Sequence, residues 1–586
     1  MKTQSTSSSR CLNCDLLVIG SGASGLAAAV TAASQGLKVI LVEKHETFGG
    51  ATAWSGGWLW IPGNPLAKRA GIHEDPQQPR TYLRNELGSR YNVERVDAFL
   101  DNAPRMVSFF EEKTTLKWVD GNGIPDVHGN VPGAAVQGHQ VIAAPYDARE
   151  MGPLILRMRK TMRETSFLGM PIMAGSDLAA FLSMTRSFKS FTHVTKRFLR
   201  HLRDLALHGR AMHLVNGVAL VARLAKSAVD LGVTLIESAP ARKLIMNQGK
   251  VVGAIVDTLQ GPTQIRATRG VVLAAGGFPN DMQRRKALFP RTPTDKDHLA
   301  LPPVDCSGDG ISLGESAGGV LDIDVASPAA WAPVSLVRHG DGTLGHFPHI
   351  IDRAKPGLIG VLSTGKRFVN EADGYYDYTA AMVAGAPEGE EVASWLICDH
   401  RFQRRFGLGH SRPFPLPVGP SVRSGYLQRA ESIQALAERC GIDPVGLSET
   451  VRNFNEHARN GKDPEFGRGS TPYNCKQGDP LITEGNPCVA PIEHGPFYAV
   501  KVRPGSFGTF AGLKTNGHAQ VLDRSGTTIT GLYAVGTDMA SVMGGFYPSG
   551  GINLGPAMTF GYIAGLHAAS KQSSQAPPPG KPGGST

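Results

Sequence analysis

Three glycines near the start of the chain have the spacing of a dinucleotide-binding turn. Gly20, Gly22 and Gly25 follow a short apolar run and open a stretch of small residues. Glycines in that setting allow a tight turn and let backbone amides and a helix N-terminus approach a pyrophosphate. Glu43 ends a second apolar run eighteen residues beyond Gly25, where its carboxylate can accept hydrogen bonds from ribose hydroxyls. From this unit we expect cofactor contacts at Gly20, Gly22, Ala23, Ser24, Gly25, Glu43 and Lys44.

Three further clusters, rich in glycine with hydroxyl or acidic residues, indicate a ligand longer than one adenosine unit. The segment 48–57 follows the first unit directly, 274–278 ends another apolar run, and 532–538 places Asp538 after a run near the C-terminus. Such clusters suit the flavin end of FAD, whose ribityl hydroxyls a carboxylate can bind. We find no second glycine triad with its own acidic partner, so we expect no separate NAD(P)H domain. The expected contacts are Gly49, Gly50, Ala51, Thr52, Ser55, Gly56, Gly57, Ala275, Gly276, Gly277, Gly536 and Asp538.

The elements that must hold these residues are a strand, a helix and a second strand. Residues 16–19 and 39–42 are short, continuously apolar runs, as expected for strands buried on both faces, and 25–35 between them has a helical pattern. Further strands are expected at 251–256, 271–275 and 531–535. Because the last of these lies near the C-terminus, the FAD-binding domain is predicted to be discontinuous.

Five short motifs along the chain are distinctive. They are Gly49-Gly50-x-Thr52, Ser307-Gly308-Asp309-Gly310, the segment 365–371 that ends in Asn370-Glu371, the segment 495–499 and the segment 555–561. With these motifs the chain, from about Asp15 to Ala569, resembles the fumarate reductase and succinate dehydrogenase flavoprotein superfamily. Within that superfamily it is most similar to the 3-ketosteroid dehydrogenases.

The resemblance implies an α/β fold with a Rossmann-like FAD-binding domain and an inserted α+β substrate-binding (catalytic) domain. It also implies cofactor contacts at Asp309, Gly551 and Leu554. Both ends of the chain are rich in Ser, Pro or Gly and are expected to be disordered tails. The expected divisions are a tail at 1–14, the first FAD-binding part at 15–284, the substrate-binding domain at 285–505, the second FAD-binding part at 506–570 and a tail at 571–586.

The chemistry implied by the resemblance is the desaturation of a cyclic ketone next to its carbonyl. The carbon beside the ketone loses a proton, the next carbon gives a hydride to the flavin, and hydrogen-bond donors hold the ketone oxygen. Tyr547 and the backbone amide of Gly551 match the family's donors. Tyr375 has the spacing of the family's tyrosine base, and we expect Ser549 to stabilise the phenolate of that base through a hydrogen bond.

Two positions leave the site of desaturation open. The serine at position 549 resembles the residue found there in the family branch that desaturates 3-ketosteroids at the 4,5 bond. The 1,2-desaturating relatives carry a relay tyrosine in a segment that aligns with 125–128, and there this chain has His128 instead. A 3-ketosteroid is the favoured substrate, desaturated at either the 4,5 or the 1,2 bond. The same residues could act equally well on a non-steroid cyclohexanone carboxylate.

Two other functions remain as alternatives. A fumarate-reductase-like enzyme that reduces an unsaturated carboxylate would need arginine and histidine side chains to bind the carboxylates and donate a proton. The segment 540–555 contains neither residue type, and Arg367 and Arg503 both have ordinary surface interpretations. A flavin-binding protein without turnover is the second alternative, and the Tyr375, Tyr547 and Gly551 set speaks against it.

Composition and cysteine usage set the expected class and compartment. Of 586 residues, 41% are apolar and 19% are charged, as in a folded protein with sizeable cores. The seven cysteines form an odd, scattered set that indicates reduced thiols in a cytoplasmic protein. Cys11 and Cys14 lack the further ligands of a zinc site, so no metal is expected. No run approaches the roughly 18 uninterrupted apolar residues of a membrane-spanning helix.

The net charge of +10 is partly concentrated between residues 186 and 210. Phenylalanine and leucine interleave with the basic residues there, which permits contact with a membrane surface or with an acidic or lipid-like substrate. A solvated basic face is the favoured interpretation. We expect a small hydrophobic ketone as substrate, an electron acceptor that the sequence does not identify, no nucleic acid, and no membrane contact beyond a peripheral one. The basic residues are Arg186, Lys189, Lys196, Arg197, Arg200, Arg203 and Arg210, opposed by Asp204.

Overall fold

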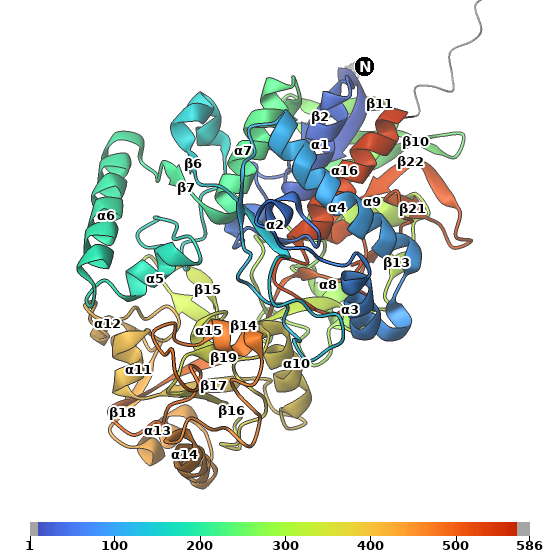
Figure 1. The fold of residues 1–586 in the computed structure, drawn as a ribbon. Coiled ribbons are helices and arrows are strands. Elements are labelled where there is room, and N and C mark those ends of the chain that lie inside the picture. Colours follow the sequence, from blue (N-terminus) through green and yellow to red (C-terminus); the bar gives the residue numbers. More distant parts are fainter. Residues whose placement is uncertain (1–9, 571–586) are drawn as a thin grey trace, which may run out of the picture.

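The computed structural model describes residues 10–570 (Figure 1). Strand β1 (Arg10–Ile19) opens the fold, so the prediction that the N-terminal tail extends to residue 14 is wrong. The reason is a partner far along the chain, because Arg10–Cys14 pair in parallel with Thr263–Ala267 of strand β11 (Gly261–Leu273). The rest of that tail, 1–9, and the expected tail at 571–586 lie outside the described residues.

An eight-stranded sheet carries the predicted strand-helix-strand unit. Its order is β21-β22-β11-β1-β2-β8, and β10 and β9 extend it as an antiparallel pair beside β11. Strands β22, β11, β1, β2 and β8 are mutually parallel, and β2 is buried along its whole length, which explains its continuously apolar sequence. The bounds are β2 (Val39–Val42), β8 (Thr234–Ile236), β9 (Ala241–Asn247), β10 (Lys250–Thr258), β21 (Gln520–Leu522) and β22 (Thr528–Ala534).

Helix α1 (Ala23–Ser34) packs between this sheet and helix α16 (Leu554–Ser570), as Figure 1 shows. The two helices approach closely because α16 presents glycine to α1: a Cβ atom at Gly561 would lie 2.4 Å from the carbonyl oxygen of Ser24. The predicted α/β fold class is confirmed. Further helices between residues 51 and 316 are α2 (Pro65–Arg69), α3 (Gln77–Leu87), α4 (Val93–Lys113), α7 (Asn216–Asp230), α8 (Met282–Leu288) and α9 (Asp309–Ser316), and short 3-10 turns are η1 (Ala51–Trp54), η2 (Gly88–Arg90) and η5 (Gly536–Asp538).

A second sheet of seven strands is built from the middle of the chain. Its order is β15-β14-β19-β17-β16, and β12 and β18 also pair with β19. Its bounds are β12 (Leu299–Ala300), β14 (Ala329–Arg338), β15 (Leu344–Pro348), β16 (Leu358–Val361), β17 (Ser394–Cys398), β18 (Gln428–Ala430) and β19 (Phe497–Thr509). The helices and turns around it are η4 (Asp352–Ala354), α10 (Tyr375–Gly385), α11 (His400–Arg405), α12 (Gly419–Arg423), α13 (Ile433–Cys440), α14 (Pro444–Ala458) and α15 (Pro472–Gln477).

Membership of the two sheets supports an insertion. The first sheet takes its strands from 10–273 and 520–534, whereas the second takes them from 299–509. Strand β19 runs four residues past the expected boundary at 505, and the domain limits themselves stay a prediction. Smaller sheets complete the fold, formed by β3 (Trp58–Trp60), β5 (Gln140–Ala143) and β4 (Trp118–Asp120), by β6 (Tyr146–Asp147) and β7 (His213–Leu214), and by β13 (Leu321–Asp322) and β20 (Gly512–Leu513).

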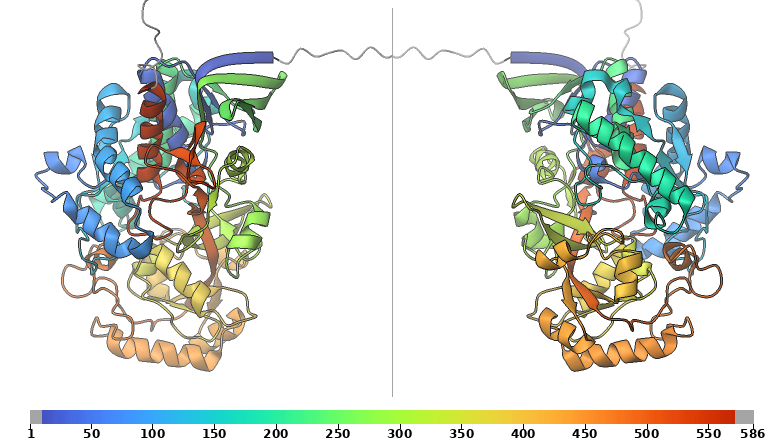
Figure 2. Two further views of the ribbon diagram at one scale, coloured as in Figure 1. Left: turned by 90° about the vertical axis from the view of Figure 1, so that its right-hand side faces the viewer. Right: turned by 90° about the vertical axis from the view of Figure 1, so that its left-hand side faces the viewer.

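The region 154–229 contains the end of η3 (Ala148–Arg157), α5 (Ser176–Leu182), α6 (Phe188–His208) and most of α7. Helix α6 lies at the outer edge of the molecule in Figure 1 and faces the viewer in the right-hand view of Figure 2. Within residues 10–570, no helix combines the length and apolar character needed to cross a bilayer.

Candidate active site

The glycine triad forms the turn that the sequence predicts between β1 and α1. Gly20 has φ of +107°, and a Cβ atom there would lie 2.2 Å from the carbonyl oxygen of Ala274, so only glycine fits. A Cβ atom at Gly25 would lie 2.0 Å from the carbonyl oxygen of Gly20. Gly22 is the N-cap of α1 and supplies no side chain to its first turn. A helix N-terminus that its own N-cap residue does not cover fits a pyrophosphate.

Glu43 and Asp309 bind protein groups close to the turn. Glu43, at the end of β2, accepts hydrogen bonds from the backbone amide of Ser21 (3.1 Å) and from that of His45 (2.9 Å), and it is almost fully buried. Lys44 donates to Asp309 at 2.7 Å and to Ser307 at 2.8 Å. The structure therefore brings together Lys44 and Asp309, which are 265 residues apart and were both expected to contact the cofactor.

The glycine-rich segment 48–57 folds back onto the triad. The hydroxyl of Thr52 accepts a hydrogen bond from the amide of Ala23 (2.9 Å), and the amide of Gly49 donates to the hydroxyl of Ser21 (2.9 Å). Gly50 has φ of +50° and is the N-cap residue immediately before the turn η1. The segment also contains Ala51, Ser55, Gly56 and Gly57.

Asp538 joins the third and fourth clusters. Its carboxylate is fully buried and accepts hydrogen bonds from the amides of Ala275 (2.5 Å) and Gly277 (2.9 Å). Burial raises the pKa of Asp538 to about 6, against the lowering effect of those amides. A carboxylate oxygen can accept more than one hydrogen bond, so contact with the ribityl hydroxyls, together with Gly276, Gly536 and Leu554 as cofactor contacts, stays a prediction.

The two predicted catalytic tyrosines meet although 172 residues separate them. Tyr375 is the first residue of α10, and Tyr547 lies in the loop between η5 and α16. The hydroxyl of Tyr375 donates to that of Tyr547 at 2.8 Å, and the ring centroids lie 4.9 Å apart in an edge-to-face arrangement. Burial raises the pKa of both phenols well above their usual value, so both are protonated at neutral pH.

The hydrogen bonds around Tyr547 leave its own proton without an acceptor among residues 10–570. Its oxygen accepts from Tyr375 and, at 3.3 Å, from the side-chain amide of Asn553. A phenol has one donor and two acceptor positions, so with both acceptor positions occupied the remaining group is a donor. The backbone amide of Gly551 likewise has no hydrogen-bond acceptor among residues 10–570. These two groups have the chemistry required to hold a ketone oxygen on which negative charge develops.

Ser549 has a different partner from the one the sequence suggested. We expected its hydroxyl to stabilise the phenolate of Tyr375, but it is fully buried and accepts a hydrogen bond from Gln140 of β5 at 2.9 Å. The hydroxyl of Tyr375 is directed to Tyr547 instead. The contact of Ser549 therefore fixes the loop against β5, because it joins two side chains 409 residues apart.

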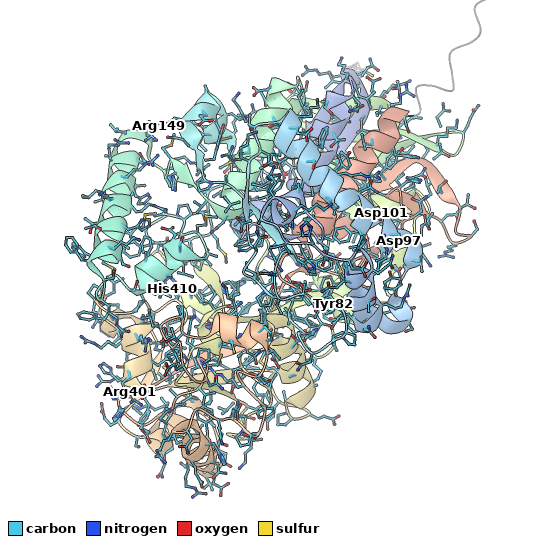
Figure 3. The ribbon with its side chains drawn as sticks, in the orientation of Figure 1. Tyr82, Asp97, Asp101, Arg149, Arg401 and His410 are labelled. Carbon is cyan, nitrogen blue, oxygen red and sulfur yellow. The ribbon has the colours of Figure 1, made fainter. Side chains whose placement is uncertain are left out.

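The loop that carries Tyr547 is also fixed through Pro548. The carbonyl oxygen of Pro548 accepts from the hydroxyl of Tyr82 at 2.7 Å and from the amide of Val127 at 3.0 Å, and Tyr82 is labelled in Figure 3.

His128, the residue after Val127, lies between Glu86 (2.9 Å) and Asp377 (3.2 Å), so it links α3 to α10. Burial lowers the pKa of His128, but the two carboxylates outweigh it and raise the pKa to about 10. His128 is therefore an imidazolium at neutral pH.

The Asn370-Glu371 motif anchors the start of α10. Glu371 is fully buried and accepts two hydrogen bonds from Arg367, at 2.7 and 2.8 Å. The surface interpretation of Arg367 is wrong, because this guanidinium is buried and also paired with Asp463 at 2.8 Å. Arg353 donates to the carbonyl oxygens of Glu371 and Asp373, just before Tyr375. No part of this network is free to clamp a substrate carboxylate.

Comparison with known proteins identifies the family. The model of the FAD binding domain family matches residues 15–554. The chain belongs to this family of FAD-binding flavoproteins. It is 41% identical to 4-oxocyclohex-2-ene-1-carboxylate 5-dehydrogenase of Sinomonas cyclohexanicum, covering 95% of this chain and 94% of the relative. It is 34% identical to 3-oxosteroid 1-dehydrogenase of Mycolicibacterium smegmatis, covering 95% and 97%. The crystal structure of 3-ketosteroid delta1-dehydrogenase from Sterolibacterium denitrificans, 32% identical, superimposes with a TM-score of 0.88 over 96% of this chain and 100% of that one.

The flavoprotein is thus an FAD-dependent oxidoreductase of the 3-oxosteroid dehydrogenase type. The glycine turn, the N-terminus of α1 and the segment 48–57 fit FAD, and the family match confirms the predicted cofactor. Cys11 and Cys14 lie on β1, and within the described residues of the flavoprotein no three His, Cys, Asp or Glu side chains gather as a metal site would require.

Sequence reasoning missed the residues that position the two tyrosines in the flavoprotein. Asn553 lies six residues beyond Tyr547, a spacing that could have drawn attention to it. Gln140, Tyr82 and Val127 carried no signal, because each acts through a contact with a loop more than 400 residues away.

Proposed function

We propose that the protein dehydrogenates a cyclic ketone next to its carbonyl, with Tyr547 and Gly551 as donors to the ketone oxygen and Tyr375 as the acid-base residue. The support is the hydrogen-bond arrangement around Tyr547, whose proton and the neighbouring Gly551 amide lack protein acceptors. The names of the relatives, which are dehydrogenases of oxocyclohexene and oxosteroid rings, agree with this chemistry. FAD, when bound, supplies the acceptor for the hydride.

The bond between the two tyrosines gives Tyr375 a route to act without a free phenolate. The proton from the carbon beside the ketone moves to the oxygen of Tyr375, whose own proton moves to Tyr547, and the proton of Tyr547 moves to the ketone oxygen. The substrate is then an enol. Its hydride leaves from the next carbon while the carbonyl re-forms, and the proton on the substrate oxygen returns to the tyrosines and reaches solvent. One hydride and one proton have left the substrate.

A hydrophobic 3-ketosteroid is our first substrate candidate. The tyrosine pair is surrounded by aromatic side chains, with the ring of Phe507 5.2 Å from Tyr375 and that of Phe510 6.0 Å from Tyr547. Ser549 no longer argues for desaturation at the 4,5 bond, since its hydroxyl is engaged with Gln140. The oxosteroid relative is named as a 1-dehydrogenase, which supports the 1,2 bond. An oxocyclohexene carboxylate is the second candidate, because the 41% identical relative carries that name.

Anaerobic mixing tests the proposal. The oxidised holoenzyme is mixed with a saturated 3-ketosteroid or with 4-oxocyclohex-2-ene-1-carboxylate, the flavin's visible absorbance is followed, and the product with the new double bond is identified. Loss of the flavin colour with a product unsaturated next to the carbonyl is the expected result. A flavin that stays oxidised with both ketones, while the reduced protein is reoxidised by fumarate, would overturn the proposal.

We further propose a cytoplasmic protein that makes peripheral contact with a membrane, where sparingly soluble ketones collect, and that passes its electrons to an acceptor still to be identified. The support is the surface of α6, which combines exposed apolar and basic side chains. A helix with such a surface can lie in the interfacial layer of a membrane.

A further inference from the structure

Helix α6 is attached to the protein by one face only. Val194, His201 and Asp204 are its buried residues. His201 bonds the carbonyl oxygen of Leu168 at 2.9 Å, and Asp204 pairs with Arg149, which Figure 3 shows beside one end of α6. Two of the basic residues near this face are also engaged, since Arg197 pairs with Asp177 and Arg200 with Asp147. The ion pairs of the attached face therefore neutralise some, but not all, of the basic residues between 186 and 210.

The opposite face carries large apolar side chains that the described protein does not cover. Phe188 is 83% exposed, Phe191 48%, Leu199 61% and Leu202 42%. Separations of 3, 11 and 14 residues from Phe188 are close to whole turns of 3.6 residues, so these side chains form one stripe along the helix. We call this stripe the outer ridge. An uncovered apolar stripe of this kind marks an interaction surface.

Basic side chains run along one side of the outer ridge. Lys189, Lys196 and Arg203 are exposed and recur every seven residues, which keeps them in one row; we call this row the basic flank. Lys189 and Lys196 form no ion pair with any residue between 10 and 570, and Arg203 lies 3.8 Å from Asp204, which already binds Arg149 more closely. The flank therefore offers uncompensated positive charge beside an apolar ridge.

We propose that α6 docks on the surface of an anionic lipid bilayer, with the outer ridge in the interfacial layer and the basic flank against the headgroups. The proposal deepens the peripheral contact proposed above and rests on it. A helix of 21 residues is about 30 Å long, so all three flank residues can meet headgroups when it lies flat. Lipid suits both surfaces at once, because acyl chains cover the ridge while anionic headgroups neutralise the flank.

Vesicle flotation with the full-length holoenzyme tests the proposal without any ketone present. The probes are vesicles of phosphatidylcholine alone and vesicles that also contain phosphatidylglycerol. We expect the protein to float with the anionic vesicles only and to be released as salt is raised. The flank variant Lys189→Gln/Lys196→Gln/Arg203→Gln should lower partitioning on the order of 100-fold. The ridge variant Phe188→Ser/Leu199→Ser should lower it by roughly tenfold or more.

Two matched controls lie elsewhere on the surface. Leu259 is 85% exposed in the turn between β10 and β11, and Lys250 is exposed at the start of β10. The variants Leu259→Ser and Lys250→Gln should float as the native protein does. Far-ultraviolet circular dichroism and retained flavin absorbance report that the α6 variants fold.

Each result has one meaning. Absence of flotation with anionic vesicles overturns the docking proposal, as does equal flotation of the ridge, flank and control variants. Flotation that does not depend on anionic lipid overturns the role of the flank. Self-association that the ridge variant abolishes, seen in sedimentation without vesicles, would assign the ridge to a second copy instead. Because flotation needs no substrate, a protein that floats but bleaches with no ketone would refute the dehydrogenase assignment and leave the docking intact.

Discussion

The hydroxyl groups of Tyr375 and Tyr547 form a 2.8 Å hydrogen bond, with Tyr375 as donor. This bond leaves the proton of Tyr547 available to a ligand and couples the residue expected to take the substrate proton to the residue expected to bind the ketone oxygen. The first two predictions separate these two roles.

Replacing Tyr547 by phenylalanine removes the side-chain donor to the ketone oxygen. Tyr547→Phe should retain FAD but lower turnover by about 10²- to 10³-fold, as for the loss of one oxyanion donor. Steady-state kinetics together with the flavin spectrum measure both effects. Native turnover in this variant would remove Tyr547 from the mechanism.

Replacing Tyr375 by phenylalanine should stop proton removal before any hydride moves. In deuterated water without an electron acceptor, native protein should exchange the hydrogen beside the ketone, and Tyr375→Phe should slow this exchange by about 10²- to 10⁴-fold. Nuclear magnetic resonance of the ketone follows the exchange. Tyr376→Phe is the matched control, because the hydroxyl of Tyr376 donates to the carbonyl oxygen of Gly545 and not to Tyr375 or Tyr547, so the variant should leave exchange near the native rate.

Ser549→Ala distinguishes a structural hydroxyl from a catalytic one. Loss of the bond to the buried Gln140 should destabilise the protein by about 1–3 kcal/mol in thermal or urea unfolding. Turnover at low temperature should fall less than about threefold, since no proton path uses this hydroxyl. A loss of turnover comparable to that of Tyr375→Phe would restore Ser549 to the acid-base machinery.

The imidazolium of His128 should make stability depend on pH in the alkaline range. Its folded pKa of about 10 lies above the unfolded value of 6.5, so its contribution is complete below pH 6.5 and is lost as pH rises through 10. After allowance for a side chain that is about one third exposed, this contribution is about 1–2 kcal/mol. The difference in unfolding free energy between native protein and His128→Gln should therefore shrink between pH 7 and pH 10. A difference that stays constant over this range would contradict the assignment of charge to His128.

Local sequence patterns predicted the parts of the fold that depend on neighbours in the chain. The strand at 39–42 agrees residue for residue with β2, and the glycine triad forms the turn before α1. The start of β1 at Arg10 could not be predicted, because its partner Thr263 lies 253 residues away and a Ser-rich sequence resembles a tail. The buried state of Arg367 was missed for a related reason. Its partner Glu371 stands four residues on, but Asp463 is visible only in three dimensions.

The candidate site shows the same division. The resemblance to known dehydrogenases named Tyr375 and Tyr547, and the structure brings them into contact. It did not reveal that Ser549 faces Gln140 or that Pro548 is held by two donors, since these contacts depend on packing of the loop against β5 and α3. The reaction type and the catalytic residues could be inferred from the sequence. The hydrogen-bond partner of each hydroxyl could be found only from the structure.

The two tyrosines also lie beside different sheets. Tyr547 lies between η5 and α16, beside the sheet that holds the FAD-binding turn, and Tyr375 begins α10 beside the second sheet. Their hydroxyls join the surroundings of one sheet to those of the other, and His128 likewise links α3 to α10. We therefore expect flavin colour to report on the sheet with the glycine turn, and turnover to report on the contact between the two regions.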